Sequence, residues 1–239
     1  MILSVVTVIK DNPEGFERTI KSIKKQTFQQ FEYVVVDGDS EDKTLYEKHM
    51  DYIDVFVSEK DAGIYDAMNK SIRLAHGDYI HFLNSGDILH DSNVYQNIIN
   101  KLEKDIVYGN YLDNMWKEHK SPSKINEWLF VRERNLIHQT MFLRRSLLLS
   151  RPYDTTYRIV ADRKWLMECF REGRTTRWVD IVVVDYEYNG VSCQPELFFP
   201  DSRRLMIEMY GDTIIPYLFV KRRLKAILMK LKKMGNKLR

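Results

Sequence analysis

Four small or polar residues, Asn84-Ser85-Gly86-Asp87, directly follow an apolar stretch of high β-strand propensity, Tyr79 to Leu83. The pattern predicts a buried strand that ends in a turn. In an open α/β sheet, ligands bind outside the carboxyl ends of the strands. Hard cations such as Mg²⁺ are held by one or two carboxylates together with substrate phosphates. Asp87 is therefore a candidate metal ligand, and a plain turn without ligand is the alternative.

A second polar turn, Asp37-Gly38-Asp39-Ser40, follows the β-prone stretch Phe31 to Val36. An acid at such a strand end can accept a hydrogen bond from a ribose hydroxyl or a base N–H. Asp39 and Ser40 suit the cap of the next helix equally well. Neither G-x-G-x-x-G nor G-x-x-x-x-G-K-[ST] follows the first predicted strand. The sequence therefore favours neither a dinucleotide-dependent dehydrogenase nor a P-loop enzyme.

The elements that hold these turns alternate between strand and helix over about the first 110 residues. Leu3 to Ile9 is a nearly continuous β-branched run, which is typical of a parallel strand covered on both faces. Asn12-Pro13 then supplies a helix cap and a first helical position. Further strands are predicted at 53–57 and 105–109, and helices at 64–75 and 93–102. The alternation predicts an α/β fold with a doubly wound, mostly parallel sheet flanked by helices.

The second half shows a weaker pattern. An irregular stretch covers 110–136, a strand is predicted at 138–143, a helix at 162–171 and another strand at 179–186. We expect this half to supply loops and lids over the edge of the sheet. The chain of 239 residues, 44% of them apolar, suits one sizeable domain.

Two cysteines without a C-x-x-C pair argue against a disulfide framework or a zinc site. No apolar run reaches 18 residues, and the first residues, Met1 to Val6, lack the features of a signal peptide. We therefore expect the protein to reside in the reducing cytosol.

The net charge of +3 conceals an uneven distribution of charge. Residues 221–239 carry nine of the 37 basic residues and no acid, which leaves 28 basic against 34 acidic residues and a charge of −6 elsewhere. Apolar residues in this tail recur at spacings of 4 and 3, which predicts a C-terminal amphipathic helix with a basic face. They are Val220, Leu224, Ile227, Leu231, Met234 and Leu238.

Such a basic amphipathic helix is typical of a membrane surface, where each basic residue contributes roughly 1 kcal/mol of attraction to anionic lipid. An ordinary helix packed on the body or on a partner is the alternative. Nucleic acid is a third option that we do not expect.

Two long segments carry a resemblance to a known family. LSVVTVIKDNPEGFERTIKSIKKQTFQQFEYVVVDGDSEDKT and SEKDAGIYDAMNKSIRLAHGDYIHFLNSGD resemble family-2 glycosyltransferases of the GT-A fold. The likeness covers roughly residues 2–110 and thins afterwards. Its spaced elements include Gln26-Thr27, the Asp37 turn, Asp61-x-Gly63, Asn69-Lys70 and the acidic turn.

The resemblance implies roles for particular residues. Asp87 matches the metal-binding acid of the family, with Mg²⁺ or Mn²⁺ as the cofactor. Asn84 and Gly86 stand where the family has acids, so coordination would rest on Asp87 and the diphosphate of the donor. Asp37 would bond the uracil or the ribose. The remaining residues expected at the nucleotide are Thr7, Val8, Lys10, Asp61, Asn69, Lys70, Asn84 and Ser85.

The family also carries a catalytic base near a downstream helix start, and Asp162 is the matching residue. An inverting transfer requires a carboxylate beside the acceptor hydroxyl, opposite the departing nucleotide. A plain helix cap is the alternative for Asp162. His138-Gln139 resembles a pair in related polysaccharide transferases, and it would contact the diphosphate or the acceptor. A structural histidine is equally compatible with this position.

The resemblance thus implies an inverting glycosyltransferase that moves a sugar from a nucleotide-sugar, expected to be a UDP-sugar, to a saccharide or lipid-linked acceptor in bacterial surface polysaccharide synthesis. Residues 1–212 would form the GT-A domain, with 1–110 as its nucleotide-binding half and 111–212 as its acceptor-side half, and 213–239 the tail. We expect the chain in the cytoplasm, peripheral at the inner face of the membrane. A nucleotidyltransferase and a non-catalytic membrane-surface adaptor are the alternatives. The sequence leaves the oligomeric state open.

Overall fold

The computed structural model describes residues 1–217 apart from 114–116, 127, 130, 132–135 and 187–193. The predicted amphipathic helix of the tail therefore lies outside the described residues, as does Cys193. The first half forms four parallel strands in the order β3-β2-β1-β4. Their bounds are β1 Leu3–Ile9, β2 Glu32–Asp37, β3 Val55–Ser58 and β4 Tyr79–Phe82. Every residue of β1 is buried, as the β-branched run predicts for a strand covered on both faces.

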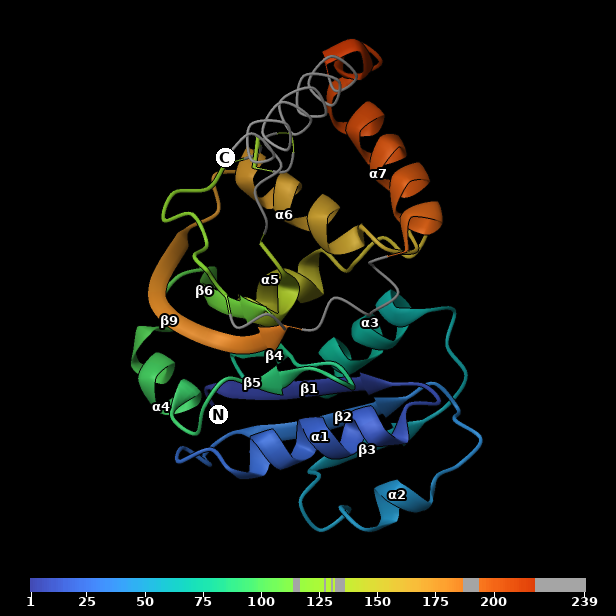
Figure 1. Cartoon of the computed structure of the whole chain (residues 1–239), viewed down its shortest axis with the longest axis vertical. Helices are drawn as coiled ribbons and strands as arrows, with labels where there is room; N and C mark the ends of the chain where they lie inside the picture. The colour runs from blue at the N-terminus through green and yellow to red at the C-terminus, as the bar shows by residue number, and fades with distance from the viewer. Residues whose placement is uncertain (114–116, 127, 130, 132–135, 187–193, 218–239) are drawn as a thin grey trace, which may run out of the picture.

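The strands that follow β4 in the chain extend the same sheet beyond it, in the order β4-β8-β6-β9-β5, and β7 pairs with β6. Strand β8 is antiparallel to β4 and to β6, so the whole sheet is mixed, and only its first four strands are uniformly parallel. The second half thus contributes strands of the core as well as the expected loops. The strands after β4 are β5 Ile88–Leu89, β6 Ile106–Asp113, β7 Glu118–His119, β8 Met141–Arg144 and the strongly curved β9 Thr176–Tyr186 (Figure 1), of which β7, β8 and β9 come from the second half.

Helices cover both faces of the sheet, and the sheet separates two apolar cores (Figure 1). One face carries α1 Pro13–Lys24, α2 Thr44–Glu47, α4 Val94–Ile98 and the 3₁₀ turn η1 Ile99–Lys101. The other face carries α3 Ile64–Leu74, α5 Arg145–Ser150, α6 Ala161–Arg171 and α7 Pro195–Tyr210. The α/β prediction is confirmed by this layered arrangement.

Local signals explain where some elements begin. The side chain of Asn12 caps α1 by accepting from the Gly15 backbone N–H at 3.1 Å, and Pro13 opens the helix. The strand predicted at 138–143 starts later than expected, because residues 138–140 form the 3₁₀ turn η2. Both the N–H and the hydroxyl of Thr140 donate to the Ile137 carbonyl, which favours this turn over a strand.

A buried histidine lies in β4, on the core face that packs against α4. The ring of His81 stacks on Phe142 at 4.3 Å between centroids, and its two nitrogens lie 3.1 Å from the Tyr95 hydroxyl and 2.8 Å from the Gln139 carbonyl oxygen. Burial lowers the pKa of His81 to about 4, because the apolar surroundings disfavour its charged form.

This histidine makes stability depend on pH. The His81 side chain binds a proton near pH 6.5 in the unfolded chain and only near pH 4 in the folded chain. The contribution of His81 is therefore fully present above pH 6.5 and is lost as the pH falls towards 4, by about 3 kcal/mol in total. His81→Gln should flatten this part of the curve in chemical denaturation between pH 6.5 and 4. Parallel curves for His81→Gln and the wild type would contradict the assignment.

Candidate active site

The acidic turn joins β4 to β5, and its backbone is held from helix α1. Gly86 has φ +106°, a conformation that residues with a Cβ atom rarely adopt, so the turn requires a glycine at this position. The Thr19 hydroxyl donates to the Asp87 carbonyl at 2.8 Å and accepts from the Gly86 N–H at 3.0 Å. The turn that presents the Asp87 carboxylate is thus fixed by contacts from another element.

The side chains of this turn form a polar group. One oxygen of Asp87 accepts from the Gln139 amide at 3.2 Å, and the other accepts from the Asn84 backbone N–H at 3.2 Å. The Asn84 amide nitrogen lies 3.1 Å from His138 Nε2. Asn84 is 8% exposed, and its buried Oδ1 has no hydrogen-bond partner among the described residues. A buried acceptor without a partner is costly, which indicates that a ligand supplies one.

Oxygen atoms of this kind fit a small divalent cation. The carboxylate of Asp87 and the amide oxygen of Asn84 are both hard ligands, and Mg²⁺ or Mn²⁺ needs few of them when a diphosphate supplies the rest. Within the described part of the chain, no group of three His, Cys, Asp or Glu side chains could bind a metal by itself. A cation held by these two oxygens would need further ligands, which the diphosphate of a donor can supply.

Asp162 lies in the first turn of α6, as the sequence predicts, with its side chain 13% exposed. Its Oδ1 accepts from the Tyr65 hydroxyl at 2.9 Å and from the Arg163 N–H at 2.8 Å, while its Oδ2 lies 3.4 Å from His138 Nδ1. Burial alone would raise the pKa of this carboxyl. The hydrogen bond and charge of His138 outweigh it and hold the pKa of Asp162 below its ordinary value.

His138 connects the two acids. Its Nδ1 faces Asp162, and its Nε2 faces the Asn84 amide. Burial would lower the pKa of His138, but the paired carboxylate of Asp162, aided by the charge of Asp87, raises it. Asp87, Asn84, His138 and Asp162 therefore form one continuous polar cluster, although the two acids come from different halves of the chain. The placement fits a contact of His138 with ligand, which stays a prediction.

Several residues expected at the nucleotide are buried and bonded within the protein. The Thr7 hydroxyl donates to the Leu83 carbonyl at 2.8 Å. Asn69 pairs with both backbone groups of Tyr153, at 2.8 and 2.9 Å. Asp37 has no exposed surface and accepts from three hydroxyl groups, while Val8 is 5% exposed. The donors to Asp37 are Ser40 at 2.5 Å, Ser58 at 2.6 Å and Tyr46 at 3.1 Å.

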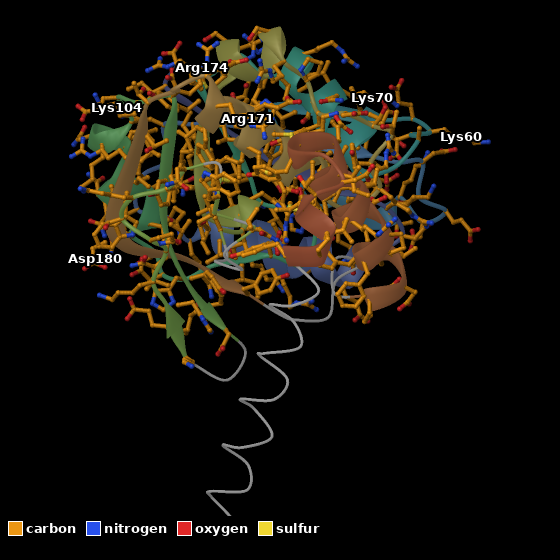
Figure 2. The ribbon with its side chains drawn as sticks, turned by 90° about the horizontal axis from the view of Figure 1, so that it is seen from above. Lys60, Lys70, Lys104, Arg171, Arg174 and Asp180 are labelled. Atoms are coloured by element: carbon orange, nitrogen blue, oxygen red, sulfur yellow. The ribbon has the colours of Figure 1, made fainter. Side chains whose placement is uncertain are left out.

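Other predicted nucleotide residues have exposed surface. Lys10, Asp61 and Lys70 lie around the end of β2, and Ser85 follows β4. A Cβ atom at Gly38 would lie 2.3 Å from Asp61 Oδ2 and 3.3 Å from Lys10 Cδ, so glycine lets both side chains approach this turn. Lys70 pairs with Glu59 at 3.0 Å, and Figure 2 shows it on the same side of the molecule as Lys60. Ser85 donates to the Asn12 carbonyl at 3.0 Å. A nucleotide role for these residues also stays a prediction.

Comparison with known proteins identifies the family. The model of glycosyl transferase family 2 matches residues 4–170. A PGL/p-HBAD biosynthesis glycosyltransferase of Mycobacterium bovis is 32% identical over 191 residues, which cover 72% of this chain and 72% of that protein. An uncharacterized glycosyltransferase of Mycobacterium tuberculosis is 28% identical over 240 residues, which cover 93% of this chain and 87% of that protein.

Two solved structures share the fold. S. aureus TarS 1–349 in complex with UDP has a TM-score of 0.68 and 19% identity, covering 89% of this chain and 67% of that chain. The mannosyltransferase PcManGT from Pyrobaculum calidifontis, in complex with GDP-Man and Mn²⁺, has a TM-score of 0.63 and 17% identity, covering 90% and 71%. The matched region runs from β1 into α6 and so includes the acidic turn and Asp162. The chain therefore belongs to glycosyl transferase family 2 and has the GT-A fold.

Proposed function

We propose that this glycosyltransferase inverts the donor linkage, using a nucleotide-sugar, expected to be a UDP-sugar, and a saccharide or lipid-linked saccharide acceptor of surface polysaccharide synthesis. The observation that carries the proposal is the single polar cluster in which His138 and Asn84 connect Asp162 to Asp87. Structures of the same fold hold UDP, UDP-GlcNAc, or GDP-Man with Mn²⁺, which supports a nucleotide-sugar donor.

In this mechanism Asp162 acts as the general base. Its carboxylate is ionised at neutral pH, with a pKa that the paired His138 lowers, and is therefore available to accept a proton. The acceptor hydroxyl loses its proton to Asp162 while its oxygen attacks the anomeric carbon of the donor. The bond from that carbon to the diphosphate oxygen breaks, and its electron pair leaves with the diphosphate. Attack from the face opposite the leaving group inverts the anomeric centre.

Asp87 and the unpaired Oδ1 of Asn84 would hold Mg²⁺ or Mn²⁺ together with oxygens of the donor diphosphate. A cation bound there offsets the negative charge that develops on the leaving diphosphate. Gln139 orients the Asp87 carboxylate through the hydrogen bond at 3.2 Å. The helix-capping alternative for Asp162 does not account for its contacts with His138 and Tyr65.

Nucleotide release tests this function. The protein should release UDP from at least one UDP-sugar in a panel of UDP- and GDP-sugars supplied with Mn²⁺, and it should release no pyrophosphate when it is given UTP and a sugar 1-phosphate instead. Release of GDP alone would show that the donor is a GDP-sugar and not the expected UDP-sugar. The proposed transfer chemistry would be unaffected. Release of pyrophosphate would indicate a nucleotidyltransferase. A protein that binds no nucleotide in calorimetry and releases none would fit the non-catalytic adaptor.

For the tail we propose a peripheral position at the inner face of the cell membrane. Among the described residues, no helix is long and apolar enough to cross a membrane. The basic residues of 221–239 and the regular apolar spacing within them support attraction to anionic lipid. A membrane-bound enzyme would also lie next to a lipid-linked acceptor.

Deletion of residues 216–239 should abolish flotation with liposomes that contain anionic lipid, because the deleted segment carries the excess of positive charge. Neutral liposomes serve as the control and should float neither form. Equal flotation of the full-length and the shortened protein with anionic liposomes would exclude this role of the tail.

A further inference from the structure

A buried tyrosine of the first half contacts the carboxylate of the second half. Tyr65 lies in the first turn of α3 and is 6% exposed. Its hydroxyl has two acceptors within hydrogen-bond distance, the Ile159 carbonyl oxygen at 2.5 Å and Asp162 Oδ1 at 2.9 Å. The contact joins residues 97 positions apart in the sequence, and no resemblance or sequence pattern had singled it out.

The contacts of Asp162 distinguish its two oxygens. Oδ1 accepts two hydrogen bonds, one from Tyr65 and one from the Arg163 backbone N–H. Oδ2 faces the His138 ring on the side of the acidic turn. With Oδ1 held from two directions, the plane of the carboxylate is fixed and Oδ2 is the oxygen directed at the cluster.

We propose that Tyr65 is the positioning residue of Asp162, holding Oδ2 towards the acceptor hydroxyl; the inference rests on the proposed role of Asp162 as base. The hydroxyl of Tyr65 carries a single proton and has two acceptors within reach. It donates to Asp162 while the carboxylate is charged. Once Oδ2 has taken the proton of the acceptor hydroxyl, Oδ1 is a weaker hydrogen-bond acceptor and the Ile159 carbonyl can receive the same donation.

The second acceptor is itself fixed in place. Asp201 of α7 accepts from the backbone N–H groups of Arg158 and Ile159, at 2.7 and 2.9 Å. These two hydrogen bonds hold the loop before α6, and with it the Ile159 carbonyl, next to Tyr65. Helix α7 thus fixes the loop that carries one of the two acceptors of the Tyr65 hydroxyl.

A neighbouring tyrosine provides a matched comparison. The ring of Tyr153 is 5.4 Å from that of Tyr65 between centroids, and Tyr153 is 3% exposed. Its buried hydroxyl has no partner among the described residues. Tyr153→Phe therefore removes the same atom, a hydroxyl oxygen, from the same core. It removes no hydrogen bond to Asp162.

The test compares Tyr65→Phe with Tyr153→Phe in the full-length protein. Tyr65→Phe should lower kcat about tenfold, the low end for a hydrogen bond to a charged group, and leave the donor KM within about twofold. Tyr153→Phe should leave both constants unchanged. In an Asp162→Asn background, Tyr65→Phe should produce no further loss, because the hydrogen bond acts only through the base.

An unchanged kcat in Tyr65→Phe would overturn the proposal, and so would an equal loss in the wild-type and Asp162→Asn backgrounds. Full turnover of Asp162→Asn would instead remove the proposed base, so the two failures are distinguishable. If Tyr65→Phe does not fold, 3-fluorotyrosine at position 65 keeps the hydroxyl and alters its donor strength. This replacement should then change kcat, while 3-fluorotyrosine at position 153 should not. If the two substituted proteins had equal kcat values, the proposal would be overturned.

Discussion

Asp162→Asn is expected to reduce sugar transfer to a small residual rate while UDP binding stays at the wild-type level. Asparagine has nearly the same size and can still accept from the Tyr65 hydroxyl, but it cannot take a proton at neutral pH. Loss of a general base lowers the rate by about 10²- to 10⁴-fold. Steady-state release of UDP in the presence of acceptor measures kcat, and calorimetric titration with UDP measures binding.

Glu168→Gln is the matched control for this variant. Glu168 lies in the same helix, and its side chain is 33% exposed and pairs with Arg151 at 3.7 Å, outside the polar cluster. Its turnover should equal that of the wild type. Wild-type turnover in Asp162→Asn would remove Asp162 from the mechanism and leave its contacts with His138 and Tyr65 as structural ones.

Asp87→Asn is expected to eliminate the stimulation of UDP binding by Mn²⁺ and to lower kcat/KM by about a hundredfold or more, since a cation at a leaving diphosphate contributes several kcal/mol. The substitution removes the one negative charge of the acidic turn and leaves an acceptor for Gln139. Calorimetric titration with UDP, with and without Mn²⁺, measures the effect. The wild type should bind more tightly with the metal, and Asp87→Asn should bind equally in both conditions.

Asp91→Asn provides the control for the loss of an acid from this region. Asp91 is exposed and caps the next turn by accepting from the Asn93 N–H at 2.7 Å, a bond that asparagine can keep. The response of this variant to Mn²⁺ should match that of the wild type. If Asp87→Asn still responds fully to Mn²⁺, the cation binds elsewhere and the acidic turn has another purpose.

The sequence predicted those parts of the site that depend on local signals. Strand β1 has its predicted bounds, Asn12 caps α1, and Asp162 lies in the first turn of α6. Strand composition, helix caps and polar turns act over a few residues, so they can be read without knowing the fold. The acidic turn belongs to this group, and the reason for Gly86 within it appears only from its backbone angle.

The remaining features depend on contacts between distant residues. Tyr65 looks from the sequence like one more residue of a helix and becomes informative only when α6 brings Asp162 to it. The burial of Asp37 likewise depends on Ser58, a residue of the next strand. The insertion of β8 between β4 and β6 has no local signal either, because either direction of pairing suits an apolar strand.

The most direct test of the central claim is a crystal structure of the protein with UDP and Mn²⁺, with data collected at the manganese absorption edge. We predict an anomalous peak in contact with the Asp87 carboxylate, Asn84 Oδ1 and the diphosphate, with Asp162 Oδ2 facing the same cavity from the other side. A peak away from Asp87, or UDP bound at a distance from the cluster that joins Asp87 to Asp162, would contradict the account.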